Sequence, residues 1–211
     1  MKTRIFNLVI IDESGSMHSV KRDTINNVNE TIQTIRAAQN KHENQEHYVT
    51  IVTFHNDVNT VCDCVKVDEV KEFNEDTYNP NCCTALYDAM GMSLHSLKKN
   101  VAENDKVLVT IITDGYENAS QEYDGKAIKA LVEELKGKGW VFAYIGADHD
   151  VEAVASSLSI KNYMVLEKST KGFSKMTAKL NKSRGDLYAS MCCESYSSKV
   201  ANENFFVDEE E

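Results

Sequence analysis

The sequence predicts an α/β fold, a mostly parallel sheet with helices packed on both of its faces. Short apolar runs, clearest at residues 6–11 and 107–112, alternate along the chain with segments whose apolar residues recur every three or four positions. Such alternation is typical of strand–helix–strand units, which build parallel sheets. The two runs are almost continuously apolar, as expected of strands buried on both faces.

The individual elements follow from the same two patterns. We expect strands at 6–11, 48–54, 58–67, 107–112, 140–145 and 163–166. In 58–67, valines alternate with other side chains, as on a half-exposed edge strand. Apolar residues at helical spacing predict three helices, marked by Ile25, Val28, Ile32 and Ile35; by Leu86, Met90, Leu94, Leu97 and Val101; and by Ile128, Leu131 and Leu135. A short helix is expected at 151–158, capped by Asp150.

The chain changes character near residue 167. We divide it into a domain at 1–167, a basic amphipathic helix at 168–188 packed on that domain, and an acidic, flexible tail at 189–211. The helix has an apolar face and a basic stripe made of Lys168, Lys171, Lys175, Lys179 and Lys182, with Arg184 following it. The stripe fits a solvated face, or a docking face for an acidic partner or for residues 208–211.

Composition limits the function classes. The formal net charge of −10 argues against binding nucleic acid, whose phosphates would be repelled. No apolar run reaches the length of a membrane span, and the first twelve residues lack a secretory signal pattern. We therefore expect a cytoplasmic protein with no membrane partner. Its six cysteines should be reduced, and their spacing does not match a zinc site.

Oxygen-bearing side chains gather at the predicted carboxyl edge of the sheet. Asp12, Ser14 and Ser16 alternate directly after the first strand, and Asp114 follows the buried strand at 107–112. Thr84 lies just before a helix whose start should open on the same edge. Carboxylates and hydroxyls suit a hard cation, Mg²⁺ or alternatively Mn²⁺ or Ca²⁺. The plainer interpretation of the first loop is that Ser14 or Ser16 caps a helix.

The three segments resemble the metal-ion-dependent adhesion site of von Willebrand factor type A domains. That family has the pattern D-x-S-x-S, then T, then D, which here reads Asp12, Ser14 and Ser16, then Thr84, then Asp114. The resemblance covers residues 5–166. The family commonly has small residues, often glycines, before its threonine, where this chain has Cys82 and Cys83.

The resemblance implies a Rossmann-like three-layer α/β/α fold with one antiparallel edge strand. It implies that the two serines and the threonine ligate the ion directly, and that the aspartates often act through water. It also implies a partner protein whose Glu or Asp supplies the last ligand, so we expect an adaptor or assembly factor and not an enzyme. Residues that could line the rim of the partner site are Glu13, His18, Tyr116, Glu117 and Asp148.

Two other functions stay open. A metal-dependent hydrolase of phosphate esters would need a general base near the ion, and Glu13, His18 and Glu117 are the candidates. A phosphatase of the haloacid dehalogenase type is disfavoured because Ser14 stands where its general acid is needed. The third possibility is a degenerate scaffold that holds no metal.

Overall fold

The computed structural model describes residues 2–193 and 195–206, so the part of the predicted tail at 207–211 lies outside the described residues. One six-stranded sheet organises these residues, in the order β3-β2-β1-β4-β5-β6. The strands are β1 (Thr3–Asp12), β2 (Gln45–Phe54), β3 (Val58–Lys66), β4 (Lys106–Thr113), β5 (Val141–Gly146) and β6 (Tyr163–Val165). Only the β2–β3 pair is antiparallel, which confirms the predicted edge strand and the mostly parallel α/β fold.

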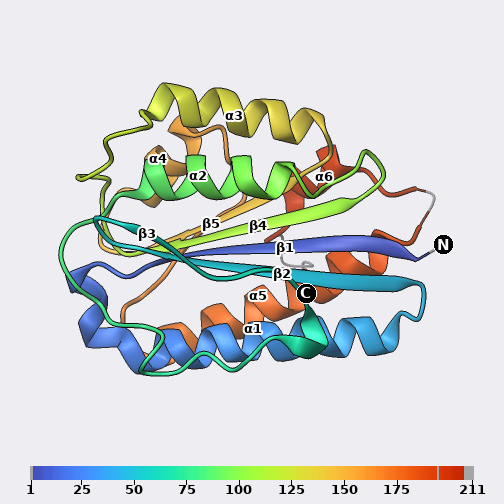
Figure 1. The fold of residues 1–211 in the computed structure, drawn as a ribbon, viewed down its shortest axis with the longest axis horizontal. Coiled ribbons are helices and arrows are strands. Elements are labelled where there is room, and N and C mark those ends of the chain that lie inside the picture. The colour runs from blue at the N-terminus through green and yellow to red at the C-terminus, as the bar shows by residue number, and fades with distance from the viewer. Residues whose placement is uncertain (1, 194, 207–211) are drawn as a thin grey trace, which may run out of the picture.

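Helices cover both faces of this sheet (Figure 1). The α-helices are α1 (Lys21–Lys41), α2 (Leu86–Lys98), α3 (Gly125–Gly137), α4 (Val151–Ser157), α5 (Thr170–Ser190) and α6 (Ser198–Asn204), with short 3₁₀ turns η1 (Gly15–Val20) and η2 (Val67–Glu69). Helices α1 and α5 lie on one face, and α2, α3 and α4 lie on the other. Asp150 caps α4 as expected, accepting a hydrogen bond from the amide of Ala153 at 3.0 Å.

The pleat of β1 divides the core into two layers. Ile5, Val9 and Ile11 point to the α1 and α5 side, whereas Leu8 and Ile10 point to the α2 and α3 side. All five are essentially inaccessible to solvent. The apolar run that predicted the strand therefore serves two helical layers at once, because successive side chains of a strand face opposite sides.

The strand order places a topological switch point between β1 and β4. From β1 the chain continues to β2, toward one edge of the sheet, and from β4 it continues to β5, toward the other edge. Ligands of open α/β sheets bind at such a switch point, beyond the carboxyl ends of the strands. Asp12 ends β1, and Asp114 follows β4 directly, so both carboxylates lie at this point.

Helix α5 is an integral part of the α1 layer. Phe173, Met176 and Leu180 are buried against α1 and the sheet, as their spacing predicted. Arg184, which follows the lysines of the stripe, does not extend the exposed basic face. It is 1 % exposed and donates hydrogen bonds to the hydroxyls of Thr31 (2.6 Å) and Thr110 (3.0 Å).

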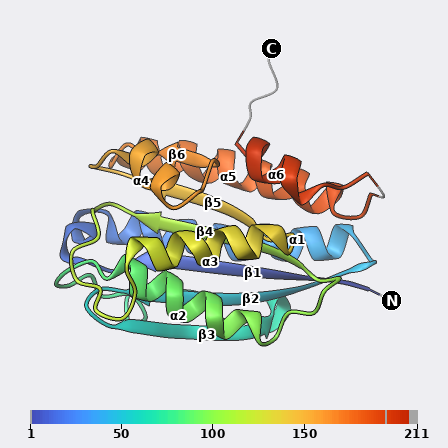
Figure 2. The same cartoon turned by 90° about the horizontal axis from the view of Figure 1, so that it is seen from above.

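The segment after α5 also differs from the prediction of a flexible tail. It contains α6, which lies beside α5 and β5 (Figure 2). Asn202 on α6 is buried, accepts a hydrogen bond from the amide of Phe142 at 3.1 Å and donates one to the carbonyl of Trp140 at 2.8 Å. These contacts fix the segment to the buried backbone at the start of β5, ahead of the residues that pair with β6. No helix among residues 2–193 and 195–206 has the length and apolarity needed to cross a membrane.

Candidate functional site

Three loops meet at the β1–β4 switch point and are joined to one another by backbone hydrogen bonds. The loop after β1 is joined to the loop before α2 by the hydrogen bonds Gly15 N to Cys82 O (3.2 Å) and Asn81 N to Glu13 O (2.8 Å). An added Cβ on Gly15 would lie 3.5 Å from the Cys82 carbonyl, so the two backbones pass in close contact. Cys82 adopts a φ of 57°, a left-handed conformation that favours glycine and fits the family's preference for small residues here.

Asp12 is the innermost group of the site. Its side chain is fully buried, and it accepts hydrogen bonds from the Thr113 hydroxyl (2.6 Å) and from the Ser14 amide (2.7 Å). Burial raises the pKa of the Asp12 carboxyl, although these hydrogen bonds oppose the rise, and the nearby charge of Asp114 raises it further. Neither hydrogen-bond donor is a charged group, so the carboxylate is desolvated without a cation in direct contact.

Ser14, Ser16 and Asp114 form a chain of oxygen atoms next to Asp12. The two serine hydroxyls lie 3.0 Å apart, and the Ser16 hydroxyl donates to Asp114 Oδ1 at 2.6 Å. Ser14 stands at the N-cap position of η1 but makes no side-chain capping hydrogen bond, which disfavours the plainer interpretation of this serine. Side chains that are a hundred residues apart in the sequence therefore converge, as the motif predicted.

Thr84 is held beside Asp114 by the loop that follows β4. Its amide donates to Asn118 Oδ1 at 2.9 Å, and its carbonyl accepts from the Asn118 amide at 3.0 Å. Its hydroxyl would lie 3.7 Å from a Cβ built on Gly115. The structure thus brings all five predicted ligand residues to one place. Whether they bind an ion stays a prediction.

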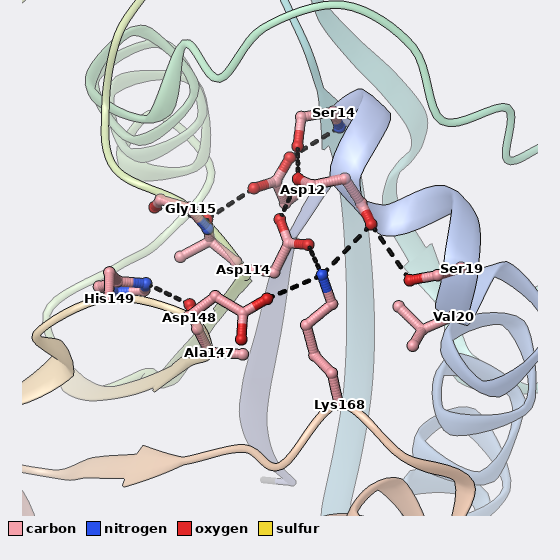
Figure 3. A network of polar contacts seen from close by, with 12 residues as sticks. Asp12, Ser14, Ser19, Val20, Asp114, Gly115, Ala147, Asp148, His149 and Lys168 are labelled. Carbon is pink, nitrogen blue, oxygen red and sulfur yellow. Dashed lines mark hydrogen bonds and ion pairs between the residues drawn. The ribbon is translucent and has the colours of Figure 1, made fainter.

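Lys168 completes this cluster (Figure 3). It comes from the loop between β6 and α5, and its ammonium contacts Asp114 Oδ2 at 2.7 Å, Asp148 Oδ2 at 3.0 Å and the Ser16 carbonyl at 3.3 Å. Burial lowers the pKa of Lys168, but the contacts with the two carboxylates outweigh it, and the net pKa is raised. Lys168 is therefore a site residue and not part of the helical stripe to which its spacing assigned it.

The five predicted rim residues divide into two groups. Glu13 is 7 % exposed, and its carboxylate accepts from the Asn79 amide, while Glu117 accepts from the amides of Ala119 (2.8 Å) and Ser120 (2.7 Å). These two carboxylates hold loop backbones. His18, Tyr116 and Asp148 are exposed around the site.

The donor set fits a hard divalent cation. Two carboxylates and three hydroxyls provide only oxygen atoms, which are the ligands that Mg²⁺ or Mn²⁺ prefers. A cation nearby would also stabilise the charge of the desolvated Asp12 carboxylate. Within the described ranges, no three histidine, cysteine, aspartate or glutamate side chains gather in an arrangement that could hold a metal ion. A site here would therefore depend on the neutral hydroxyls of Ser14, Ser16 and Thr84.

Sequence reasoning missed two contributors to the site. Thr113, which orients Asp12, directly precedes Asp114 and could have been noticed as a second hydroxyl at the end of β4. Lys168 carried no such signal, because its contact with Asp114 depends on how β6 ends.

A mostly parallel sheet with one antiparallel edge strand and helices on both faces defines a three-layer α/β domain. The family model described as von Willebrand factor type A domain matches residues 8–179. The chain belongs to the von Willebrand factor type A domain family. A search of curated proteins found no match.

Three solved structures illustrate the similarity of fold. A von Willebrand factor type A protein from Catenulispora acidiphila is 16 % identical, with a TM-score of 0.59, over 84 % of this chain and 42 % of that one. The ArnB paralog VWA2 from Sulfolobus acidocaldarius is 20 % identical, with a TM-score of 0.57, over 86 % and 45 %. The pilus adhesin SpaC from Lactobacillus rhamnosus GG, in an open conformation, is 13 % identical, with a TM-score of 0.64, over 89 % and 30 %. The chain thus spans less than half the length of each.

Proposed function

We propose that this chain is a protein–protein interaction module whose binding depends on a divalent cation, and that it acts as an adaptor or assembly factor and not as an enzyme. Ser14, Ser16 and Thr84 would hold the ion, with Asp12 and Asp114 balancing its charge. A Glu or Asp of a partner protein would then complete the coordination of the ion. Mg²⁺ is the first candidate, with Mn²⁺ or Ca²⁺ as alternatives.

The observation that carries this proposal is the convergence of the serine hydroxyls on Asp114, next to the buried Asp12. Ser16 is exposed whereas Asp12, Ser14 and Thr84 are buried. The cluster is therefore closed on the side of the sheet and open at Ser16, the direction from which a partner could approach.

The hydrolase alternative loses support from the positions of its candidate bases. Glu13 and Glu117 are engaged with backbone amides, and His18 is exposed on η1. A hydrolase needs a base within hydrogen-bond reach of the attacking water. Turnover of generic phosphate esters with Mn²⁺, lost on replacing Asp114 with alanine, would establish the hydrolase instead.

One observation favours a metal-free scaffold as the second candidate. The ammonium of Lys168 already pairs with Asp114, so the cluster is partly neutralised without an ion. A scaffold would show the same thermal stability with Mg²⁺ and with chelator, whereas an ion that binds only the folded state must raise it.

The partner is tested by affinity capture from an extract of the cell that encodes the chain. Immobilised wild-type protein in Mg²⁺ is expected to retain at least one protein that is released by chelator and is not retained by Ser14→Ala, because that variant lacks a ligand hydroxyl. Ser157→Ala is the matched control, since this serine lies on α4 and bonds only the Val154 carbonyl. Equal retention of every captured protein in chelator contradicts the proposal.

A further inference from the structure

The ammonium of Lys168 uses its three N–H donors on three different loops. The acceptors are Asp114 after β4, Asp148 after β5 and the Ser16 carbonyl at the start of η1 (Figure 3). The Lys168 side chain is 17 % exposed, and that of Asp114 is 1 % exposed. This pair is therefore shielded from solvent, unlike an ordinary surface ion pair.

The backbone on both sides of Lys168 holds it at the site. The Leu166 amide donates to the Gly146 carbonyl at 2.7 Å, which ties the end of β6 to β5. Directly after Lys168, the Ser169 hydroxyl caps α5 by accepting from the Gly172 amide at 3.0 Å. The lysine thus projects from a short segment that is fixed at both ends, so its position does not depend on a mobile loop.

Both oxygens of Asp114 are engaged in this arrangement. Oδ2 accepts from Lys168, and Oδ1 accepts from the Ser16 hydroxyl. A divalent cation bound by the Ser16 hydroxyl and the Asp114 carboxylate would lie next to the ammonium of Lys168. Both groups are positively charged and would share the same carboxylate. Two positive charges next to one carboxylate repel each other strongly when little solvent lies nearby to screen them.

We propose that Lys168 is a tethered cation that competes with the divalent ion for Asp114 and so determines how tightly this site binds metal. This inference rests on the proposed function, because it concerns the same site. In the absence of metal, Lys168 keeps Asp114 paired. When an ion binds, the ammonium gives up Asp114 and becomes more accessible to solvent. Binding is then an exchange of one cation for another, and its affinity is lower than the donor set alone would give.

The test measures Mn²⁺ binding by calorimetry to the wild type, to Lys168→Met and to Lys161→Met. The control Lys161 forms an exposed pair with Glu203 and precedes β6, on the side away from the site. We expect Lys168→Met to bind Mn²⁺ at least about tenfold more tightly than the wild type, because one like charge is removed next to the ion. Lys161→Met should match the wild type.

A second measurement needs no variant and decides the matter even if Lys168→Met does not fold. Acetylation of the wild type by acetic anhydride, read by mass spectrometry, should modify Lys168 faster when Mn²⁺ is present, with the exposed Lys171 as internal reference. Unchanged Lys168 labelling at saturating Mn²⁺ overturns the inference.

The outcomes separate this inference from the proposed function. Equal Mn²⁺ affinity of the wild type and Lys168→Met overturns the inference and leaves the metal-dependent module standing. If Lys168→Met binds Mn²⁺ and the wild type does not, the competition is supported and the metal-dependent function of the native chain is contradicted. Absence of Mn²⁺ binding by both proteins overturns both proposals.

Discussion

Replacing Asp12 with asparagine is expected to abolish divalent-cation binding without lowering the stability of the metal-free protein. The carboxylate is fully buried, and its hydrogen-bond donors are the neutral Thr113 hydroxyl and Ser14 amide. Burying a charge without a charged partner costs free energy, and an amide of nearly the same shape removes that cost. The same change removes one of the two charges that would attract the ion, so Mn²⁺ affinity should fall at least about 100-fold.

Two measurements check this expectation together. Calorimetry with Mn²⁺ reports the affinity, and thermal unfolding in chelator should give a midpoint for Asp12→Asn equal to or above that of the wild type. Asp105→Asn is the matched control, because Asp105 precedes β4 at the opposite end of the strand from Asp114 and pairs with Arg4. The expectation is contradicted if Asp12→Asn keeps wild-type affinity for Mn²⁺.

Two glycines of α5 are expected to respond to alanine in opposite directions. A Cβ on Gly172 would lie 2.0 Å from the carbonyl oxygen of Glu167, a backbone atom, whereas a Cβ on Gly185 would meet nothing within 4 Å. Gly172→Ala should therefore force the segment carrying Lys168 away from the helix, at a cost of about 2–3 kcal/mol. Gly185→Ala should stabilise the protein by about 0.5–1 kcal/mol, because alanine loses less backbone entropy in a helix than glycine does.

Thermal unfolding of the two variants tests this contrast directly. For a chain of this size, these free energies correspond to a midpoint lower by roughly 4–12 °C for Gly172→Ala and higher by roughly 1–4 °C for Gly185→Ala. A Gly172→Ala variant as stable as the wild type would mean that the Glu167–Lys168 segment is not held as closely as the structure describes.

The fold was predictable wherever burial left a periodic signal. The apolar run of β1 serves two core layers, and the alternation in β3 marks an edge strand; both patterns are readable along the chain. The site was predictable for a different reason. The carboxyl ends of parallel strands share one edge, so Asp12 and Asp114 were expected at the same edge once both strands were recognised. Their closeness follows from the pairing of β1 with β4, which the sequence did not predict.

The segment after residue 167 was harder because charge alone does not say where a side chain lies. Lys168 has the spacing of a basic stripe, yet it reaches Asp114, and Arg184, which follows the stripe, is buried between α5, α1 and β4. The acidic composition of 189–211 likewise concealed α6, which is held by the side-chain amide of Asn202, bonded to the backbone of Phe142 in β5 and of Trp140 just before it. Such contacts between residues distant in sequence leave no local pattern.

An anomalous difference map from crystals grown in Mn²⁺ would test the central proposal most directly. We predict one manganese peak per chain, among the hydroxyls of Ser14, Ser16 and Thr84 and beside Asp12 and Asp114. The absence of a peak there at saturating Mn²⁺, with the ammonium of Lys168 still on Asp114, would contradict the account.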